Sequence, residues 1–150
     1  MNKLLLIRGD CSGAGGFVRL WWYLFRFLIW WRWRGSHSVQ VLEEPSLSVA
    51  LDAISQCDVF VFYGHGNFGL LRLQAKGDRL LAEHVQQLMS KRENDIDLVQ
   101  LSCCDSCRDE DWVAAWLEVT PHLRGYTGVT YDIKRPFSIP PCLSFRRETI

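Results

Sequence analysis

The run Val59 to Tyr63 constrains the fold of this chain more than any other segment. It reads Val-Phe-Val-Phe-Tyr, five consecutive β-branched or aromatic residues with no charge among them. A strand with one face in water alternates apolar and polar residues, whereas a continuous apolar run is typical of a strand buried on both faces. Such strands occur in the middle of parallel sheets that helices cover on both sides.

Segments with strand character alternate with segments of helical periodicity along the rest of the chain. The predicted strands are Lys3 to Arg8, Val39 to Leu42, Val59 to Tyr63, Asp97 to Ser102 and Val129 to Tyr131, and Leu70 to Leu73 pairs with Asp78 to Leu81 in a small hairpin. The predicted helices are Phe17 to Arg34, Ser46 to Gln56, Ala82 to Lys91 and Asp109 to Val119. This order predicts an α/β protein with three layers, α/β/α, and a mostly parallel central sheet of about five strands. We expect a single domain spanning residues 1–150.

The composition narrows the class of protein. Hydrophobic residues make up 48% of the chain, as in a globular domain, and the formal net charge is zero. Without a basic excess we expect no nucleic-acid binding. The opening apolar run, Leu4 to Ile7, is too short for a signal peptide. We therefore expect a cytoplasmic protein whose six cysteines are reduced.

Residues that could take part in catalysis lie at the carboxyl ends of two predicted strands. Gly64-His65-Gly66 follows one buried strand, and Ser102-Cys103-Cys104 follows the next. The carboxyl ends of parallel strands share one edge of the sheet, which is where active sites lie in such proteins. A cysteine there can attack a carbonyl carbon as a thiolate, while an imidazole takes up its proton and later protonates the leaving amine. The backbone N–H groups of Gly66 and Cys104 are candidates for an oxyanion hole.

These residues resemble a known family. Phe62-Tyr63-Gly64-His65-Gly66 resembles the strand-then-His-Gly motif of caspase-like cysteine peptidases of clan CD. Val99 to Ser106, reading Val-Gln-Leu-Ser-Cys-Cys-Asp-Ser, resembles the Leu-Ser-Ala-Cys-Glu-Thr signature of CHAT domains, and the two motifs lie 39 residues apart. The resemblance spans roughly Leu4 to Asp132. It implies a caspase-like fold and an endopeptidase that cleaves a protein or peptide substrate with a His65–Cys104 dyad and needs neither metal nor cofactor.

The resemblance also suggests which residues would determine substrate specificity. In one respect this chain departs from the family. Asp10 follows the first strand, where this fold commonly places a residue of the primary specificity pocket, and Asp132 follows the last predicted strand. A carboxylate at either place would favour an Arg or Lys side chain in the substrate; a solvated turn aspartate is the alternative. The family usually has one core strand more than is predicted here. A catalytically degenerate domain that binds a partner is therefore an alternative function.

A second alternative rests on the cysteines themselves. Cys104-Asp105-Ser106-Cys107 is a C-x-x-C motif, which occurs in redox-active proteins and in halves of zinc sites. No second C-x-x-C and no His-x-x-x-His accompanies it in the sequence.

The helix Phe17 to Arg34 carries aromatic residues all the way round. Helical periodicity assigns Phe17, Leu20, Trp21, Leu24, Leu28 and Trp31 to a core face, and Arg19, Trp22, Tyr23, Arg26, Trp30 and Trp33 to an outer face. A contiguous exposed apolar patch marks an interface, and Trp, Tyr and Arg are enriched at binding hot spots. We expect this outer face to bind a second copy of the chain or another protein, with a membrane surface as the less favoured alternative.

Overall fold

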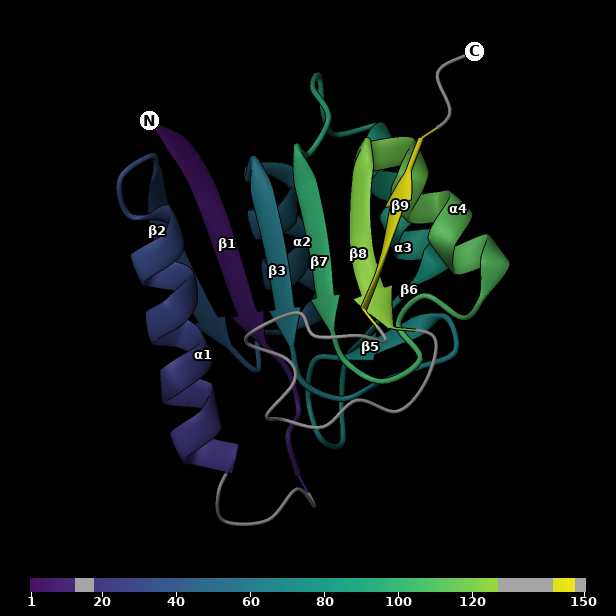
Figure 1. The fold of residues 1–150 in the computed structure, drawn as a ribbon. Helices are drawn as coiled ribbons and strands as arrows, with labels where there is room; N and C mark the ends of the chain where they lie inside the picture. Colours follow the sequence, from purple (N-terminus) through teal and green to yellow (C-terminus); the bar gives the residue numbers. More distant parts are fainter. Residues whose placement is uncertain (13–17, 127–141, 148–150) are drawn as a thin grey trace.

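The computed structural model describes residues 1–12, 18–126 and 142–147. Its centre is a six-stranded sheet in the order β2-β1-β3-β7-β8-β9 (Figure 1). The strands are β1 Asn2–Arg8, β2 His37–Glu43, β3 Val59–Tyr63, β7 Leu98–Ser102, β8 His122–Tyr126 and β9 Cys142–Arg146. Every neighbouring pair is parallel except β8 and β9, which are antiparallel. The mostly parallel sheet expected from the sequence is confirmed.

Helices cover both faces of this sheet. Helix α1 (Val18–Trp33) lies on one face, while α2 (Leu47–Ser55), α3 (Ala82–Met89) and α4 (Glu110–Val119) lie on the other (Figure 1). The arrangement is the expected three-layer α/β/α fold. The two apolar clusters between the layers share strands β1 and β3, because successive side chains of a strand point to opposite faces.

Strand β3 shows why a continuous apolar run predicts a central strand. Phe60 and Phe62 pack into the cluster under α2, α3 and α4, whereas Val59, Val61 and Tyr63 pack into the cluster under α1. All five side chains are buried. The strand lies between β1 and β7, so its backbone groups are also paired on both sides.

Two helices begin where a polar side chain can satisfy the first free backbone N–H groups. Ser46 caps α2 by accepting a hydrogen bond from the backbone N–H of Val49, and Asp109 caps α4 by accepting one from Trp112. These caps explain why the predicted starts of both helices agree with the structure to within one residue.

A second, three-stranded sheet lies beyond the carboxyl ends of the central strands (Figure 1). It consists of β4 (Gly66–Asn67), β5 (Leu70–Arg72) and β6 (Arg79–Leu81), all antiparallel. The predicted hairpin is therefore confirmed as β5 and β6. It places Arg72 beside the loops that follow β1 and β3.

The end of the sheet differs from the sequence prediction. The fifth strand is His122–Tyr126, whereas the predicted Val129 to Tyr131 lies outside the described residues. A sixth strand, Cys142–Arg146, pairs with it, so the sheet has six strands where about five were expected. Strand β8 has a glycine at position 125 because a Cβ there would lie 2.4 Å from Cys107 Sγ.

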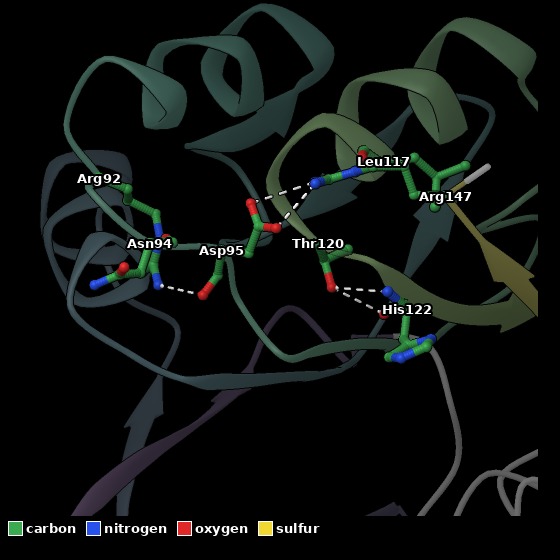
Figure 2. Close-up of polar contacts among 7 residues, drawn as sticks. All are labelled: Arg92, Asn94, Asp95, Leu117, Thr120, His122 and Arg147. Atoms are coloured by element: carbon green, nitrogen blue, oxygen red, sulfur yellow. Dashed lines mark hydrogen bonds and ion pairs between the residues drawn. The ribbon is translucent and has the colours of Figure 1, made fainter. Parts of the chain in front are cut away.

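Arg147 ties the last strand to the body of the protein. Its guanidinium donates to the backbone oxygen of Leu117 in α4 and pairs with the Asp95 carboxylate at 2.9 Å (Figure 2). Arg92, nearby, donates to the backbone oxygens of Ile54 and Cys57 at the end of α2. The two arginines thus donate to backbone carbonyl groups in the last turn of α4 and at and just after the end of α2.

The predicted faces of α1 were wrong in part. Trp22, expected outside, is 2% exposed, and Phe25 and Ile29 join it against the sheet. Leu20 and Trp31, expected inside, are exposed. Trp22 is drawn inward because its ring packs on Tyr63 and its indole N–H donates to Glu43 at 2.9 Å. No helix among the described residues has the length and hydropathy of a transmembrane span.

Candidate functional site

The structure brings His65 and Cys104 to the same edge of the sheet. Strands β3 and β7 are neighbours, and their last residues, Tyr63 and Ser102, are register partners. His65 and Cys104 each come two residues later. The loops touch at Gly66, where a Cβ would lie 2.5 Å from Cys103 Sγ and 3.3 Å from the Cys104 backbone oxygen. Only glycine allows the His-Gly segment to lie this close to the cysteines.

The backbone of His65 is held on both sides. Its N–H donates to the backbone oxygen of Asp10 at 2.8 Å, and its own oxygen accepts from the N–H of Arg72 at 3.0 Å. The chain reaches this position through Gly64, whose φ of +157° side chains rarely adopt. The sequence Gly-His-Gly is therefore a structural requirement as well as a chemical one.

The imidazole of His65 is oriented by the loop after β1. Its Nε2 lies 2.8 Å from the backbone oxygen of Ser12. Because a carbonyl oxygen can only accept a hydrogen bond, Nε2 carries the proton in this contact. In the neutral ring the lone pair is then on Nδ1, which is the nitrogen able to accept a proton.

Asp10 is buried beside this contact, with 1% of its surface exposed. Its carboxylate pairs with Arg72 Nη2 at 2.8 Å and accepts the Ser12 N–H at 2.8 Å. Burial alone would raise the pKa of Asp10, but the hydrogen bonds from Ser12 and the positive charge of Arg72 outweigh it and hold the pKa below its usual value. A substrate cation could reach Asp10 only if Arg72 moved aside. Asp132, the second predicted specificity residue, lies outside the described residues.

The loop that carries Cys104 is shaped by buried hydrogen bonds. Ser106 Oγ donates to the backbone oxygen of Leu101 at 2.9 Å and accepts the N–H of Tyr126 at 2.9 Å. The Trp112 indole N–H donates to the Ser106 backbone oxygen at 2.9 Å. Asp105 adopts a φ of +48°, a left-handed conformation that aspartate tolerates better than most residues. The turn directly after Cys104 is therefore fixed by contacts to β7, β8 and α4.

The neighbouring cysteines have different surroundings. Cys104 is half-buried, whereas Cys103 is fully buried within the apolar cluster under α2, α3 and α4. Cys57, elsewhere in that cluster, has a pKa that burial raises to about 12, so it holds its proton at neutral pH. Of Cys103, Cys104 and Cys107, the least buried is therefore Cys104, the residue that the sequence resemblance implies is the nucleophile.

The C-x-x-C motif has one half-buried and one buried member. Cys107 packs against Gly125 and is 5% exposed. Within residues 1–12, 18–126 and 142–147, no three His, Cys, Asp or Glu side chains are grouped as a metal site requires.

Sequence reasoning missed two residues of this site. Ser12 contributes a backbone oxygen, which leaves no trace in residue type, and Arg72 comes from a separate hairpin. The spacing of residues along the sequence could not have identified Ser12 or Arg72, because both contacts depend on how the small sheet packs against the loop after β1.

Solved structures of other proteins share this fold, among them two of secreted cysteine proteases. A secreted C11 cysteine protease from Bacteroides thetaiotaomicron, in complex with an irreversible peptide inhibitor, aligns with a TM-score of 0.59 and 8% identity over 88% of this chain and 50% of its own. A second structure of a secreted C11 cysteine protease from that organism, called iotapain, aligns with a TM-score of 0.58 and 8% identity over 87% of this chain and 53% of its own. This chain thus spans about half the length of either. No protein-family model and no curated protein matches it. The three-layer α/β/α fold of this chain thus resembles the caspase-like fold of the C11 cysteine proteases.

Proposed function

We propose that this protein is a caspase-like cysteine peptidase of the CHAT type, with Cys104 as nucleophile and His65 as general acid and base. The register of β3 and β7 carries the proposal, since it places both residues two positions beyond a pair of partnered strand ends. The oriented His65 ring and the exposure of Cys104 relative to Cys103 support it. The fold shared with known cysteine proteases is consistent with the same chemistry.

The proposed reaction has two halves. The Cys104 thiol passes its proton to His65 Nδ1, and the thiolate attacks the carbonyl carbon of the scissile peptide bond. The tetrahedral intermediate collapses to a thioester, and the leaving amine takes the proton from His65. Water then gives a proton to Nδ1 and attacks the thioester. Release of the carboxylic acid returns the proton to Cys104.

The remaining groups have supporting parts in this proposal. The N–H groups of Gly66 and Cys104 would donate to the oxyanion of each intermediate. Ser12 would keep the imidazole oriented while it exchanges protons at Nδ1. Asp132 and Asp10 remain proposed determinants of a preference for Arg or Lys, with Asp10 able to act only after Arg72 has moved.

Covalent labelling tests the proposal directly. We expect a peptide bearing an electrophilic ketone to modify the wild type at Cys104, as located by mass spectrometry of the digested adduct. Cys104→Ala should abolish the adduct, and His65→Ala should slow its formation by roughly 10²–10⁴-fold because the base is lost.

Cys103→Ala is the matched control, since it removes the adjacent thiol and should leave labelling intact. An adduct on Cys103 that survives in Cys104→Ala would show that the assigned nucleophile is wrong by one position. A folded wild type that forms no adduct and hydrolyses no peptide in a mixed library would favour a degenerate domain instead.

A further inference from the structure

The outward side of α1 carries a stripe of exposed hydrophobic side chains. Leu20, Tyr23, Phe27, Trp30 and Trp31 are 64%, 62%, 51%, 42% and 56% exposed, and we call these five residues the α1 stripe. Their spacing of three or four residues places them on one side of the helix. The other large exposed hydrophobic residues of the described chain, Met1, Val49, Phe68 and Met89, come from separate segments. The α1 stripe is therefore the contiguous apolar surface of the described molecule.

The stripe continues onto the edge of the sheet. Tyr23, Phe27 and Trp30 line an open groove of about 500 Å³ together with Arg26 and with Val39 and Val41 of β2. Strand β2 is the last strand at this end of the sheet. The apolar surface thus extends from α1 onto β2, the strand beside which α1 lies (Figure 1).

The charges around the stripe all have one sign. Arg19, Arg26, Arg32 and Arg34 are exposed, and residues 11–42 contain no Asp or Glu. The Arg34 guanidinium lies over the rings of Trp31, at 4.0 Å, and Trp30, at 5.0 Å. The next acidic residue, Glu43, accepts from Trp22 and pairs with Arg8. Within residues 1–12, 18–126 and 142–147, no carboxylate forms an ion pair with any of these four arginines.

This pattern argues against a second copy as the covering partner. A two-fold interface brings the same patch of both chains together. Two α1 stripes in contact would bring eight arginines, four from each chain, into one interface with no acidic residue from residues 11–42. Like charges placed opposite one another in an interface disfavour it. The arginines of this surface complement a partner with negative charges, and the α1 stripe complements a partner with an apolar interior.

We propose that α1 binds the surface of an anionic lipid bilayer. The α1 stripe would enter the boundary between headgroups and acyl chains, and the arginines would contact lipid phosphates, as in interfacial helices that combine aromatic and basic residues. Because α1 runs alongside the strands (Figure 1), the carboxyl edge of the sheet would face along the membrane. The candidate site would remain open to solvent.

Vesicle sedimentation with the full chain tests this proposal. We expect binding to vesicles of equimolar phosphatidylcholine and phosphatidylglycerol, little binding to phosphatidylcholine alone, and weaker binding as salt is added. Phe27→Ser with Trp30→Ser should weaken binding roughly tenfold or more, because two apolar side chains no longer leave water. Arg26→Ala should weaken it about fivefold, from roughly one kcal/mol per basic residue near an anionic surface.

The controls change one exposed hydrophobic residue and one exposed arginine elsewhere in the chain. Met89→Ser, on exposed α3 surface, and Arg79→Ala, on β6, should bind as the wild type does. Circular dichroism would check that each variant is folded. If the variant with both Phe27→Ser and Trp30→Ser does not fold, Arg26→Ala still tests the proposal. Absence of binding to the anionic vesicles would overturn the proposal, as would equal binding to both vesicle types. So would a lipid-free dimer that Phe27→Ser converts to monomers, since a second copy would then cover the stripe.

Discussion

Three hydrogen bonds determine where His65 can lie. Asp10 and Arg72 hold its backbone from either side, and the Ser12 oxygen holds Nε2. Side-chain and backbone freedom is therefore lost when the protein folds, before any substrate binds. A catalytic group fixed in this way need not be ordered again in each turnover. Gly64 and Gly66 are the residues that let the backbone take this path.

The cysteines differ in reactivity because their burial differs, and Cys57 provides the clearest test. Burial holds its pKa near 12, against about 9.0 in an exposed thiol. We expect iodoacetamide at pH 8 to modify Cys57 only after the chain is unfolded, because the thiolate is the reacting form. Peptide mass spectrometry of native and denatured samples would measure this. Equal modification rates in the two states would contradict it.

The same shift sets the alkaline stability of the fold. The folded pKa of Cys57 is raised, so the unfolded chain loses its proton first as the pH rises. The stabilisation is fully present below about pH 9 and declines between pH 9 and 12. In Cys57→Ala this part of the decline should be absent, as urea titrations across that range would show.

At the scale of elements, strand β4 lies in close contact with the loop that carries the cysteines. In Gly66→Ala the new Cβ would meet Cys103 Sγ at 2.5 Å. We expect a loss of about 1–3 kcal/mol in the free energy of unfolding, because an overfilled core must shift its neighbours. Gly35→Ala is the control, since its Cβ would meet nothing within 4 Å.

A double-mutant cycle would identify the cause of that loss. Cys103→Ala removes the sulfur atom but leaves the Cys103 Cβ at 3.1 Å and the Cys104 oxygen at 3.3 Å from the new methyl group. The second substitution should therefore restore part of the stability. Purely additive losses would mean that the two residues do not meet.

Elements with a clear local signal could be predicted from the sequence, and those defined by distant contacts could not. The apolar run of β3 and the capping residues Ser46 and Asp109 place their elements correctly. Helix α1 has arginine as its only polar residue type, so periodicity could not show that Trp22 would turn inward toward Glu43 and Tyr63. The residue pair at the sheet edge was identifiable because both residues directly follow buried strands.

At the scale of the whole molecule, we expect the two apolar clusters to unfold as one cooperative unit. Strands β1 and β3 contribute alternate side chains to both, so neither cluster can separate without breaking the same strands. Trp22 lies in one cluster, and Trp112 and Trp116 lie in the other. The fluorescence of these residues therefore reports on both faces of the sheet.

A core substitution on one face of the central sheet should also destabilise the packing on the other face. Phe60 is fully buried and stacks on Trp116, with ring centroids 5.6 Å apart. We expect Phe60→Leu to lower stability by about 1 kcal/mol or more and to shift the urea midpoints of tryptophan fluorescence and far-ultraviolet circular dichroism together. Val49→Ala, on exposed α2 surface, is the control. Midpoints that separate would indicate independently unfolding parts.

The contacts around His65 also determine at what stage of folding the proposed activity could begin. They join the loop after β1 to β5, and the cysteine follows β7, 39 residues after the histidine. Parallel strands pair only across a completed crossover, and contacts between residues far apart in the sequence form slowly. During synthesis, His65 leaves the ribosome before Cys104. Before the chain has folded, both residues are present but the hydrogen bonds that orient His65 have not formed. The proposed activity would begin only once the sheet had assembled, so a nascent chain would be protected from its own nucleophile.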